Sequence, residues 1–121
     1  MTLLDIKTDV SYCVGSFAEG LDHPECVAWG SDGYAYAGGE AGQLYRIDVK
    51  QNSFEEFGRA PQFVGGLCQD GSGFLYLCSG DKVYRCDQKG VLTVYSEGAD
   101  DEPMIAPNYP VFDENGGLYV S

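Results

Sequence analysis

The sequence predicts an all-β protein made of β-propeller blades, about two and a half four-stranded antiparallel blades of an incomplete ring. Two observations predict this fold class. The chain of 121 residues is 13% aromatic and contains 17 glycines, a composition typical of short strands joined by tight turns. In addition, a sequence pattern returns at intervals of roughly 40 residues, which is the length of a blade with four strands.

The repeated pattern is an apolar run, a turn rich in Asp, Asn and Gly, and a second run in which Tyr follows Gly by three places. The Gly–Tyr pairs are Gly33 with Tyr36, Gly73 with Tyr76, and Gly116 with Tyr119. The tyrosines are 40 and 43 residues apart. A Y-R-x-D motif also occurs twice, at 45–48 and 84–87. Coincidence does not account for so many matches, so we interpret the pattern as an internal repeat.

The predicted elements follow from this repeat and from local alternation of apolar and polar residues. We treat 1–121 as one partial propeller domain. A leading strand at 9–18 comes first, and propellers often close their ring with such a terminal strand. Blade one is predicted at 23–58, with strands at 26–30, 34–38, 43–49 and 52–57. Blade two is predicted at 62–97, with strands at 64–68, 74–78, 82–87 and 91–96. Blade three begins at 107–121.

No segment has a convincing helical period, so almost no helix is expected. A plain antiparallel sandwich is the alternative fold, and it ranks second because it does not require the repeat. Two and a half blades cannot close a ring. We therefore expect the chain to be the front part of a longer propeller, with blade edges that are exposed to self-association when it exists alone.

Charge and cysteine content narrow the classes of partner. Nineteen acidic against seven basic residues give a net charge of −12, which disfavours nucleic acid and anionic membrane surfaces as partners. No signal peptide and no apolar run of about 18 residues are visible. The five cysteines are odd in number and form no C-x-x-C pair. Small buried thiols in a reducing, cytoplasmic location are the expectation.

Two longer stretches carry a family resemblance: "EGLDHPECVAWGSDGYAYAGGEAGQLYRID" and "APNYPVFDENGGLYVS". They resemble the family of senescence marker protein, gluconolactonase and luciferin-regenerating enzyme over about residues 9–121. The resemblance implies a six-bladed propeller that holds a divalent cation, usually calcium or zinc, on its central axis. Several members hydrolyse lactones or related esters, so a small lactone or ester is the implied substrate. Strictosidine synthase-like proteins share the blade pattern.

The resemblance also implies site residues. Glu25 matches the Glu that opens the first inner strand and binds the metal. Asn108 matches an Asn that lies near the metal and contacts substrate, and Tyr109 stands where many members have Asp. The family's other ligands and its general base come from later blades. We therefore expect an incomplete active site here, with the catalytic residues unknown and no turnover by this chain alone.

Physical reasoning on the residues supports part of this assignment. The inner strands of all blades converge on the axis, so Glu25 and Asn108, which both precede predicted inner strands, would face one funnel. Hard oxygen ligands suit calcium or magnesium. The plainer interpretations are a rim carboxylate for Glu25, a turn residue for Asn108 and packing between blades for Tyr109. His23, the only histidine, is a candidate catalytic residue. Its position in the loop that enters blade one favours an ordinary loop residue instead.

Other conspicuous residues have structural interpretations. Four aromatic residues are expected to pack one sheet on the next: Trp29, Tyr36, Tyr76 and Tyr119. The segments 38–42 and 113–117 are expected to be turns, and 98–102 a solvated connection between blades two and three. The first functional hypothesis is therefore a metal-dependent hydrolase of the lactonase type. The alternatives are a non-catalytic propeller that serves as a binding or scaffold module, and a strictosidine synthase-like protein.

Overall fold

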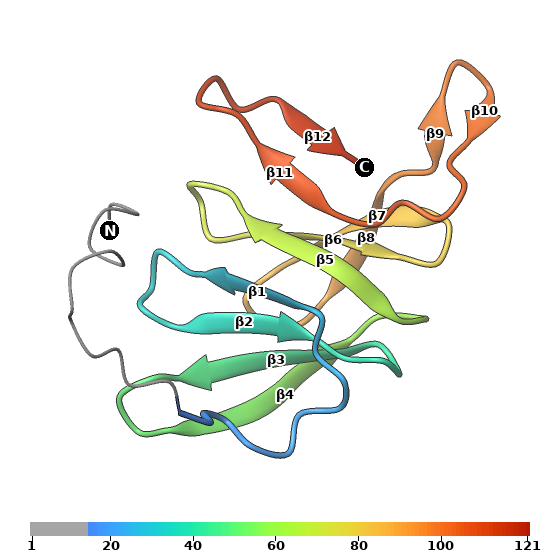
Figure 1. Ribbon diagram of the computed structural model, residues 1–121. Helices are drawn as coiled ribbons and strands as arrows, with labels where there is room; N and C mark the ends of the chain where they lie inside the picture. Colours follow the sequence, from blue (N-terminus) through green and yellow to red (C-terminus); the bar gives the residue numbers. More distant parts are fainter. Residues whose placement is uncertain (1–14) are drawn as a thin grey trace, which may run out of the picture.

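The computed structural model describes residues 15–121, and none of them is helical. Two four-stranded antiparallel sheets lie one upon the other, and a two-stranded sheet packs against the second (Figure 1). Blade one contains β1 (Cys26–Trp29), β2 (Ala35–Gly38), β3 (Gln43–Asp48) and β4 (Ser53–Arg59). Blade two contains β5 (Val64–Gln69), β6 (Leu75–Ser79), β7 (Lys82–Cys86) and β8 (Leu92–Ser96). The start of blade three is β11 (Pro110–Phe112) and β12 (Leu118–Val120).

The strand order confirms the predicted fold class. Each four-stranded sheet follows the chain order, β1-β2-β3-β4 and β5-β6-β7-β8, so each blade is a meander whose first strand is innermost. All strands predicted for the first two blades are present, with ends within two residues of those predicted. Of the predicted leading strand, 9–14 lie outside the described residues and 15–18 are not part of a strand. Ala18 nevertheless packs against blade one, and its N–H donates to Asn52 Oδ1 at 3.0 Å.

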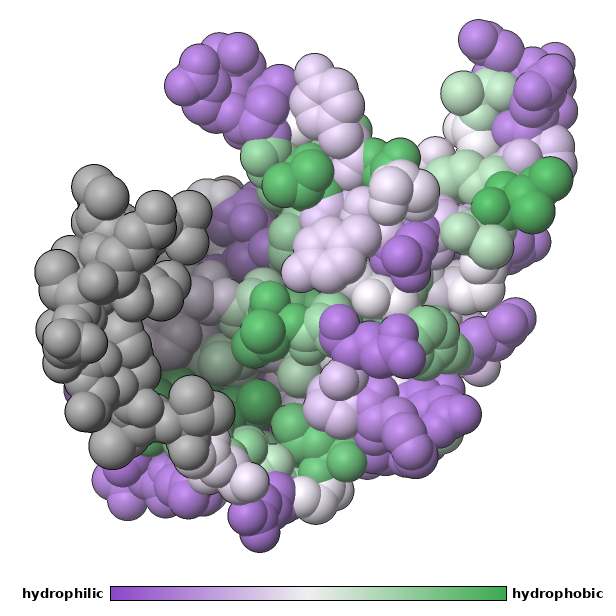
Figure 2. Space-filling view, in the orientation of Figure 1, coloured by the Kyte–Doolittle hydropathy of each residue, from purple (hydrophilic) through white to green (hydrophobic). Residues whose placement is uncertain are grey.

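The connection between blades two and three contains a feature that the sequence did not indicate. Strands β9 (Gly98–Ala99) and β10 (Glu102–Pro103) form a short hairpin that projects away from the sheets (Figure 1). Both residues at its tip, Asp100 and Asp101, have positive φ (51° and 66°). This is the backbone conformation of a two-residue hairpin turn. The hairpin is exposed, as expected of this segment, and its tip is hydrophilic (Figure 2).

One type of five-residue turn recurs in all three blades and explains the spacing of the repeat. In the turn that begins at Asp70, its N–H donates to Phe74 O at 3.0 Å and Gly73 N–H donates to Asp70 O at 3.2 Å. Asp70 Oδ1 accepts from the N–H groups of Ser72 and Phe74. Gly73 supplies the positive φ of 89° that side-chain-bearing residues rarely adopt. The turn beginning at Asp113 in blade three, and a second turn of blade two that begins at Asp87, repeat both backbone bonds and both Oδ1 contacts. The equivalent turn of blade one begins at Gly30 and repeats the two backbone bonds.

The core lies mainly between blades one and two. Its buried members come from β1 to β3 and β5 to β7, with Ala60 in the connection between the blades. They are Cys26, Tyr36, Leu44, Ala60, Val64, Leu67, Leu75, Leu77 and Cys86. Tyr76 packs on the opposite face of blade two, edge-to-face with Phe112 of β11 at 5.0 Å between ring centroids. The predicted core positions of Tyr36 and Tyr76 are thus confirmed, at 2% and 7% exposed.

The core prediction is wrong for two other aromatic residues. Trp29 is 66% exposed and Tyr119 is 62% exposed. Trp29 alternates with the inward-facing Ala28, which places it on the face of blade one that is turned away from blade two. Tyr119 lies in β12, whose sheet has two strands. Burial of these side chains requires a neighbouring sheet, and the described residues supply none at either position.

The described cysteines are free thiols, and most are buried as expected. Cys26, Cys78 and Cys86 are buried, and Cys68 is half-buried. Burial raises the pKa of Cys78 to about 11 and that of Cys86 to about 12, so these groups are neutral thiols near neutral pH. Among residues 15–121 there is also no helix that is long and apolar enough to cross a membrane.

The turn geometry predicts a measurable cost for losing one aspartate. Asp70→Ala removes two hydrogen bonds to backbone N–H groups and one from the Tyr76 hydroxyl. We expect the free energy of unfolding, measured by urea denaturation, to fall by about 1–3 kcal/mol. Glu114→Ala is the control, because Glu114 is an exposed residue of the equivalent turn in blade three. Equal stability of the two variants would contradict the assigned role of Asp70.

Candidate functional site

The strand registers define which residues are equivalent in the three blades. On each innermost strand one residue lies opposite the tyrosine of the repeat. The pairs are Ala28 with Tyr36, Cys68 with Tyr76, and Val111 with Tyr119. From Ala28, Cys68 and Val111, which lie on the innermost strands, we counted back three residues along the chain. This gives Glu25, Gly65 and Asn108. Glu25 and Asn108 therefore occupy the same position, shortly before β1 and β11. Gly65 lies beside this position in β5, where the register of β5 with β6 shifts between Val64 and Gly66. Both β1 and β11 pack beside β5.

Asn108 lies directly on the inner strand of blade two. A Cβ atom added to Gly65 would be 2.6 Å from Asn108 Oδ1 and 3.0 Å from its backbone oxygen. The Asn108 N–H is held by Ser121 O at 2.7 Å, so the strand entry is fixed within blade three. The middle position of the three is thus a glycine because a side chain there would occupy the place of the Asn108 amide.

Tyr109 covers the next glycine in the same way. A Cβ added to Gly66 would be 2.6 Å from Tyr109 Cδ2. Burial, and then the nearby thiols of Cys26 and Cys68, raise the pKa of Tyr109. The phenol ring therefore reaches from blade three across β5 toward blade one, while its side chain stays 39% exposed. This position is compatible both with the wall of a pocket and with packing between blades.

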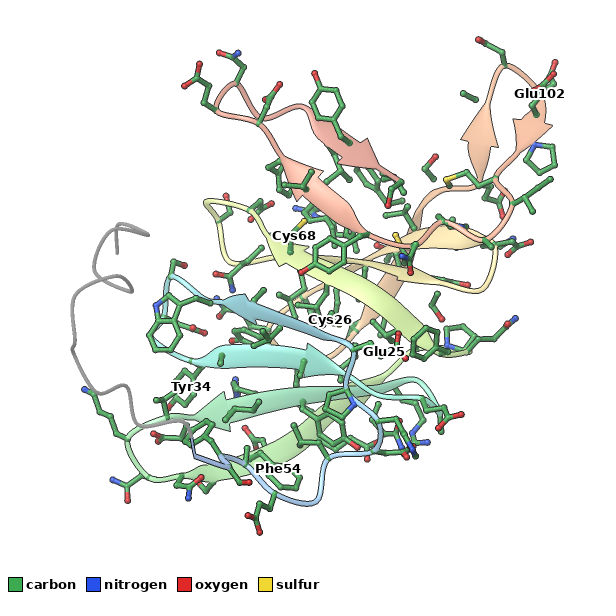
Figure 3. The ribbon with its side chains drawn as sticks, in the orientation of Figure 1. Glu25, Cys26, Tyr34, Phe54, Cys68 and Glu102 are labelled. Carbon is green, nitrogen blue, oxygen red and sulfur yellow. The ribbon has the colours of Figure 1, made fainter. Side chains whose placement is uncertain are left out.

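Glu25 is exposed and makes no hydrogen bond or ion pair with another residue of the described chain. It stands at the start of β1 (Figure 3), on the rim of a cavity of about 310 Å³. Phe17, Leu21, Val27 and Ile47 are among the apolar residues that line this cavity. Asn108 and Tyr109 are not among its lining residues. The structure thus gives Glu25 and Asn108 equivalent strand positions but does not enclose them in one pocket.

A second group of ligand-type side chains lies beside Glu25, and sequence reasoning identified only one member of it. Asp22, His23 and Glu40 each present one ligand atom, and these atoms all lie within 4.8 Å of one another. His23 Nδ1 is 3.2 Å from Asp22 Oδ1 and 2.9 Å from Glu40 Oε2. The adjacent Asp22–His23 pair is visible in the sequence. The approach of Glu40 is not, because it depends on the turn between β2 and β3.

The charges of this group act on one another. The hydrogen bond that the His23 ring donates to the Asp22 carboxylate raises the pKa of His23, and the carboxylate of Glu40 raises it further. The pKa of Asp22 is lowered, first by its hydrogen bond from Gln43 and then by its contact with His23. Both shifts favour a positive charge between the two carboxylates.

Comparison with solved structures identifies propeller proteins. A gluconolactonase from Xanthomonas campestris superimposes with a TM-score of 0.77 at 16% identity, covering 86% of this chain and 36% of its own. A virginiamycin B lyase from Staphylococcus aureus gives a TM-score of 0.66 at 17% identity, with 83% and 34% coverage. A luciferin-regenerating enzyme gives 0.57 at 17% identity, with 83% and 37% coverage. No protein-family model and no curated protein matches the sequence.

The glycines beneath Asn108 and Tyr109 allow a direct test of this packing. Gly66→Ala would place a methyl group 2.6–2.7 Å from the Tyr109 ring and the Asn108 carbonyl, so one strand must shift. We expect the free energy of unfolding to fall by about 1–3 kcal/mol and the NMR signals of the Tyr109 ring to move. Gly71→Ala is the matched control, since no atom lies within 4 Å of its added Cβ. Indistinguishable behaviour of the two variants would show that Tyr109 does not lie on β5.

The matches to solved structures show that the chain has the fold of part of a β-propeller, and that it spans about a third of the length of the enzymes it superimposes on.

Proposed function

We propose that this chain supplies the first blades of a metal-dependent propeller hydrolase of the lactonase type. The observation that carries the proposal is the equivalence of Glu25 and Asn108 at the inner-strand entries of blades one and three. The likeness of the fold to a gluconolactonase supports it.

The free thiols of Cys26, Cys68, Cys78 and Cys86 support a reducing, cytoplasmic location.

In this proposal each residue has a separate task. The Glu25 carboxylate and the Asn108 amide oxygen bind a divalent cation, for which calcium is the best match to two oxygen ligands. The Asn108 amide nitrogen is free to donate a hydrogen bond to a substrate oxygen, and the Tyr109 ring forms a wall of the pocket. A cation bound there would polarise a lactone carbonyl and lower the pKa of a bound water.

The proposal requires further groups from outside these blades. Two protein ligands fill only part of the six to eight oxygen positions of calcium and leave the others to water in this chain, and hydrolysis needs a base within about 3 Å of the attacking water. We propose that the other ligands and the base come from further blades of a longer protein. The substrate would be a small lactone or a related ester.

Calcium titration of the chain tests the ligand assignment. We expect Glu25→Gln and Asn108→Ala each to weaken Ca²⁺ binding, measured by isothermal titration calorimetry, by about tenfold, or 1.4 kcal/mol. Glu114→Gln removes an equal charge from an exposed turn and should have no such effect. The same samples should show no hydrolysis of an aliphatic δ-lactone in a pH-indicator assay. Unchanged Ca²⁺ affinity in both variants would remove the basis of the proposal, and turnover that Glu25→Gln abolishes would show that the site is complete.

We also propose that the chain self-associates through its uncovered blade faces. Val27 and Trp29 are 65% and 66% exposed on blade one, and Val111 and Tyr119 are 55% and 62% exposed on blade three. Trp29 is the only tryptophan, so its fluorescence reports burial of this face. We expect light scattering to show a mass that grows with concentration, together with a blue shift of the emission. Trp29→Ser should reduce the association, whereas a monodisperse wild-type monomer would contradict it.

A further inference from the structure

We propose that Asp22, His23 and Glu40 form a separate cation site at the rim of blade one, which takes a divalent transition metal such as Zn²⁺. The site offers one imidazole nitrogen and two carboxylate oxygens from two different loops. Imidazole nitrogen favours zinc, copper or nickel over calcium. Three protein ligands with the fourth position open to water is a common zinc arrangement. This inference does not depend on the lactonase proposal.

The two distances from the His23 nitrogen to the carboxylates agree with such a site. Tetrahedral zinc with bonds of about 2.0–2.1 Å to N and O ligands requires ligand atoms roughly 3.3 Å apart. His23 Nδ1 lies 3.2 Å from Asp22 Oδ1 and 2.9 Å from Glu40 Oε2. One imidazole nitrogen carries at most one proton, so it cannot donate fully to two carboxylates at once. A bound cation would satisfy all three groups together.

Buried neighbours hold the two ligand loops in place. Asp22 Oδ2 accepts from Gln43 Nε2 at 2.9 Å, and Gln43 is 8% exposed. The Asp22 backbone oxygen accepts from Glu40 N–H at 3.1 Å, which ties the loop before β1 to the turn between β2 and β3. Asp22 N–H donates to the Tyr45 hydroxyl at 3.1 Å. Outer contacts of this kind orient the ligands of metal sites.

The arrangement is specific to blade one, although the blades are repeats. In blade two, Gln62 and Phe63 lie in the corresponding loop, just before β5. There Gln62 N–H and its carbonyl bond to Ser79 Oγ, and Asp81 in the following turn pairs with Lys82 at 3.4 Å. In blade two, hydrogen bonds between neutral groups and one ion pair are thus found in place of the His–carboxylate group. Blade one has a longer turn, which brings Glu40 to His23, and no Lys or Arg of the described chain forms an ion pair with either carboxylate.

Zinc titration with matched variants tests the site. We expect one Zn²⁺ per chain by isothermal titration calorimetry, and about tenfold or greater weakening in both His23→Gln and Glu40→Gln. Both side chains are largely exposed, so the variants should unfold at the same urea concentration as the wild type without metal. Glu114→Gln should retain full affinity. Co²⁺ as a spectroscopic substitute should give a visible absorption band that His23→Gln abolishes.

The results that would contradict the zinc proposal differ from those that would contradict the calcium proposal. No Zn²⁺ binding, or binding that His23→Gln and Glu40→Gln leave unchanged, would overturn this proposal. Equal weakening of Zn²⁺ binding by Glu25→Gln and His23→Gln would also overturn it, because the ion would then be held at the inner-strand entry. Loss of Ca²⁺ binding in Asn108→Ala has no bearing on the rim site, so either proposal can fail while the other holds.

Discussion

The arrangement of the described blades depends on glycines of β2 and β5 that lie where neighbouring blades meet. A Cβ at Gly38 would lie 2.4 Å from Val64 Cβ, and one at Gly66 would lie 2.6 Å from the Tyr109 ring. Neither approach leaves room for a side chain, so the backbones of neighbouring blades come close at this end of the sheets. Strands in such contact cannot slide without a steric clash. Glu25, Gly65 and Asn108 therefore remain at one level of the stack.

Local chemistry made most of the fold predictable. The turns beginning at Gly30, Asp70 and Asp113 depend on residues within five positions of one another, so their sequence signature repeats with the blades. The short alternating runs between such turns can then form only strands. This is why the predicted strand ends agree closely with the structure. The β9–β10 hairpin was not predicted because two consecutive aspartates with positive φ are an uncommon solution to a tight turn.

Features that depend on neighbouring sheets were harder to predict. Trp29 was expected to pack one sheet on the next, yet its burial depends on what covers the outer face of blade one. Asn108 was predicted as a site residue, but its contact with Gly65 follows from blade packing that no pattern within one repeat encodes. Glu40 was predicted only as part of a turn, because its approach to His23 depends on how the turn between β2 and β3 lies against the loop before β1. Sequence reasoning thus located single strand entries but not the contacts between loops.

The charge distribution links the two proposed sites. The chain has 19 acidic and seven basic residues, and neither Glu25 nor Glu40 is paired with a Lys or Arg of the described chain. Carboxylates without basic partners near one end of the sheets favour cations there. The ligand atoms then separate the two sites by chemistry, oxygen alone at the inner-strand entry and oxygen with imidazole at the rim.

Paramagnetic broadening by Mn²⁺ tests the central claim most directly, namely that Glu25 and Asn108 face one cation on the inner side of the blades. The experiment uses the His23→Gln variant, so that the rim group does not compete for the ion. With substoichiometric Mn²⁺, the account predicts that the backbone amide signals of Glu25, Gly65 and Asn108 broaden first and together. Broadening centred on Asp100 and Asp101, or at Glu25 without Asn108, would contradict it.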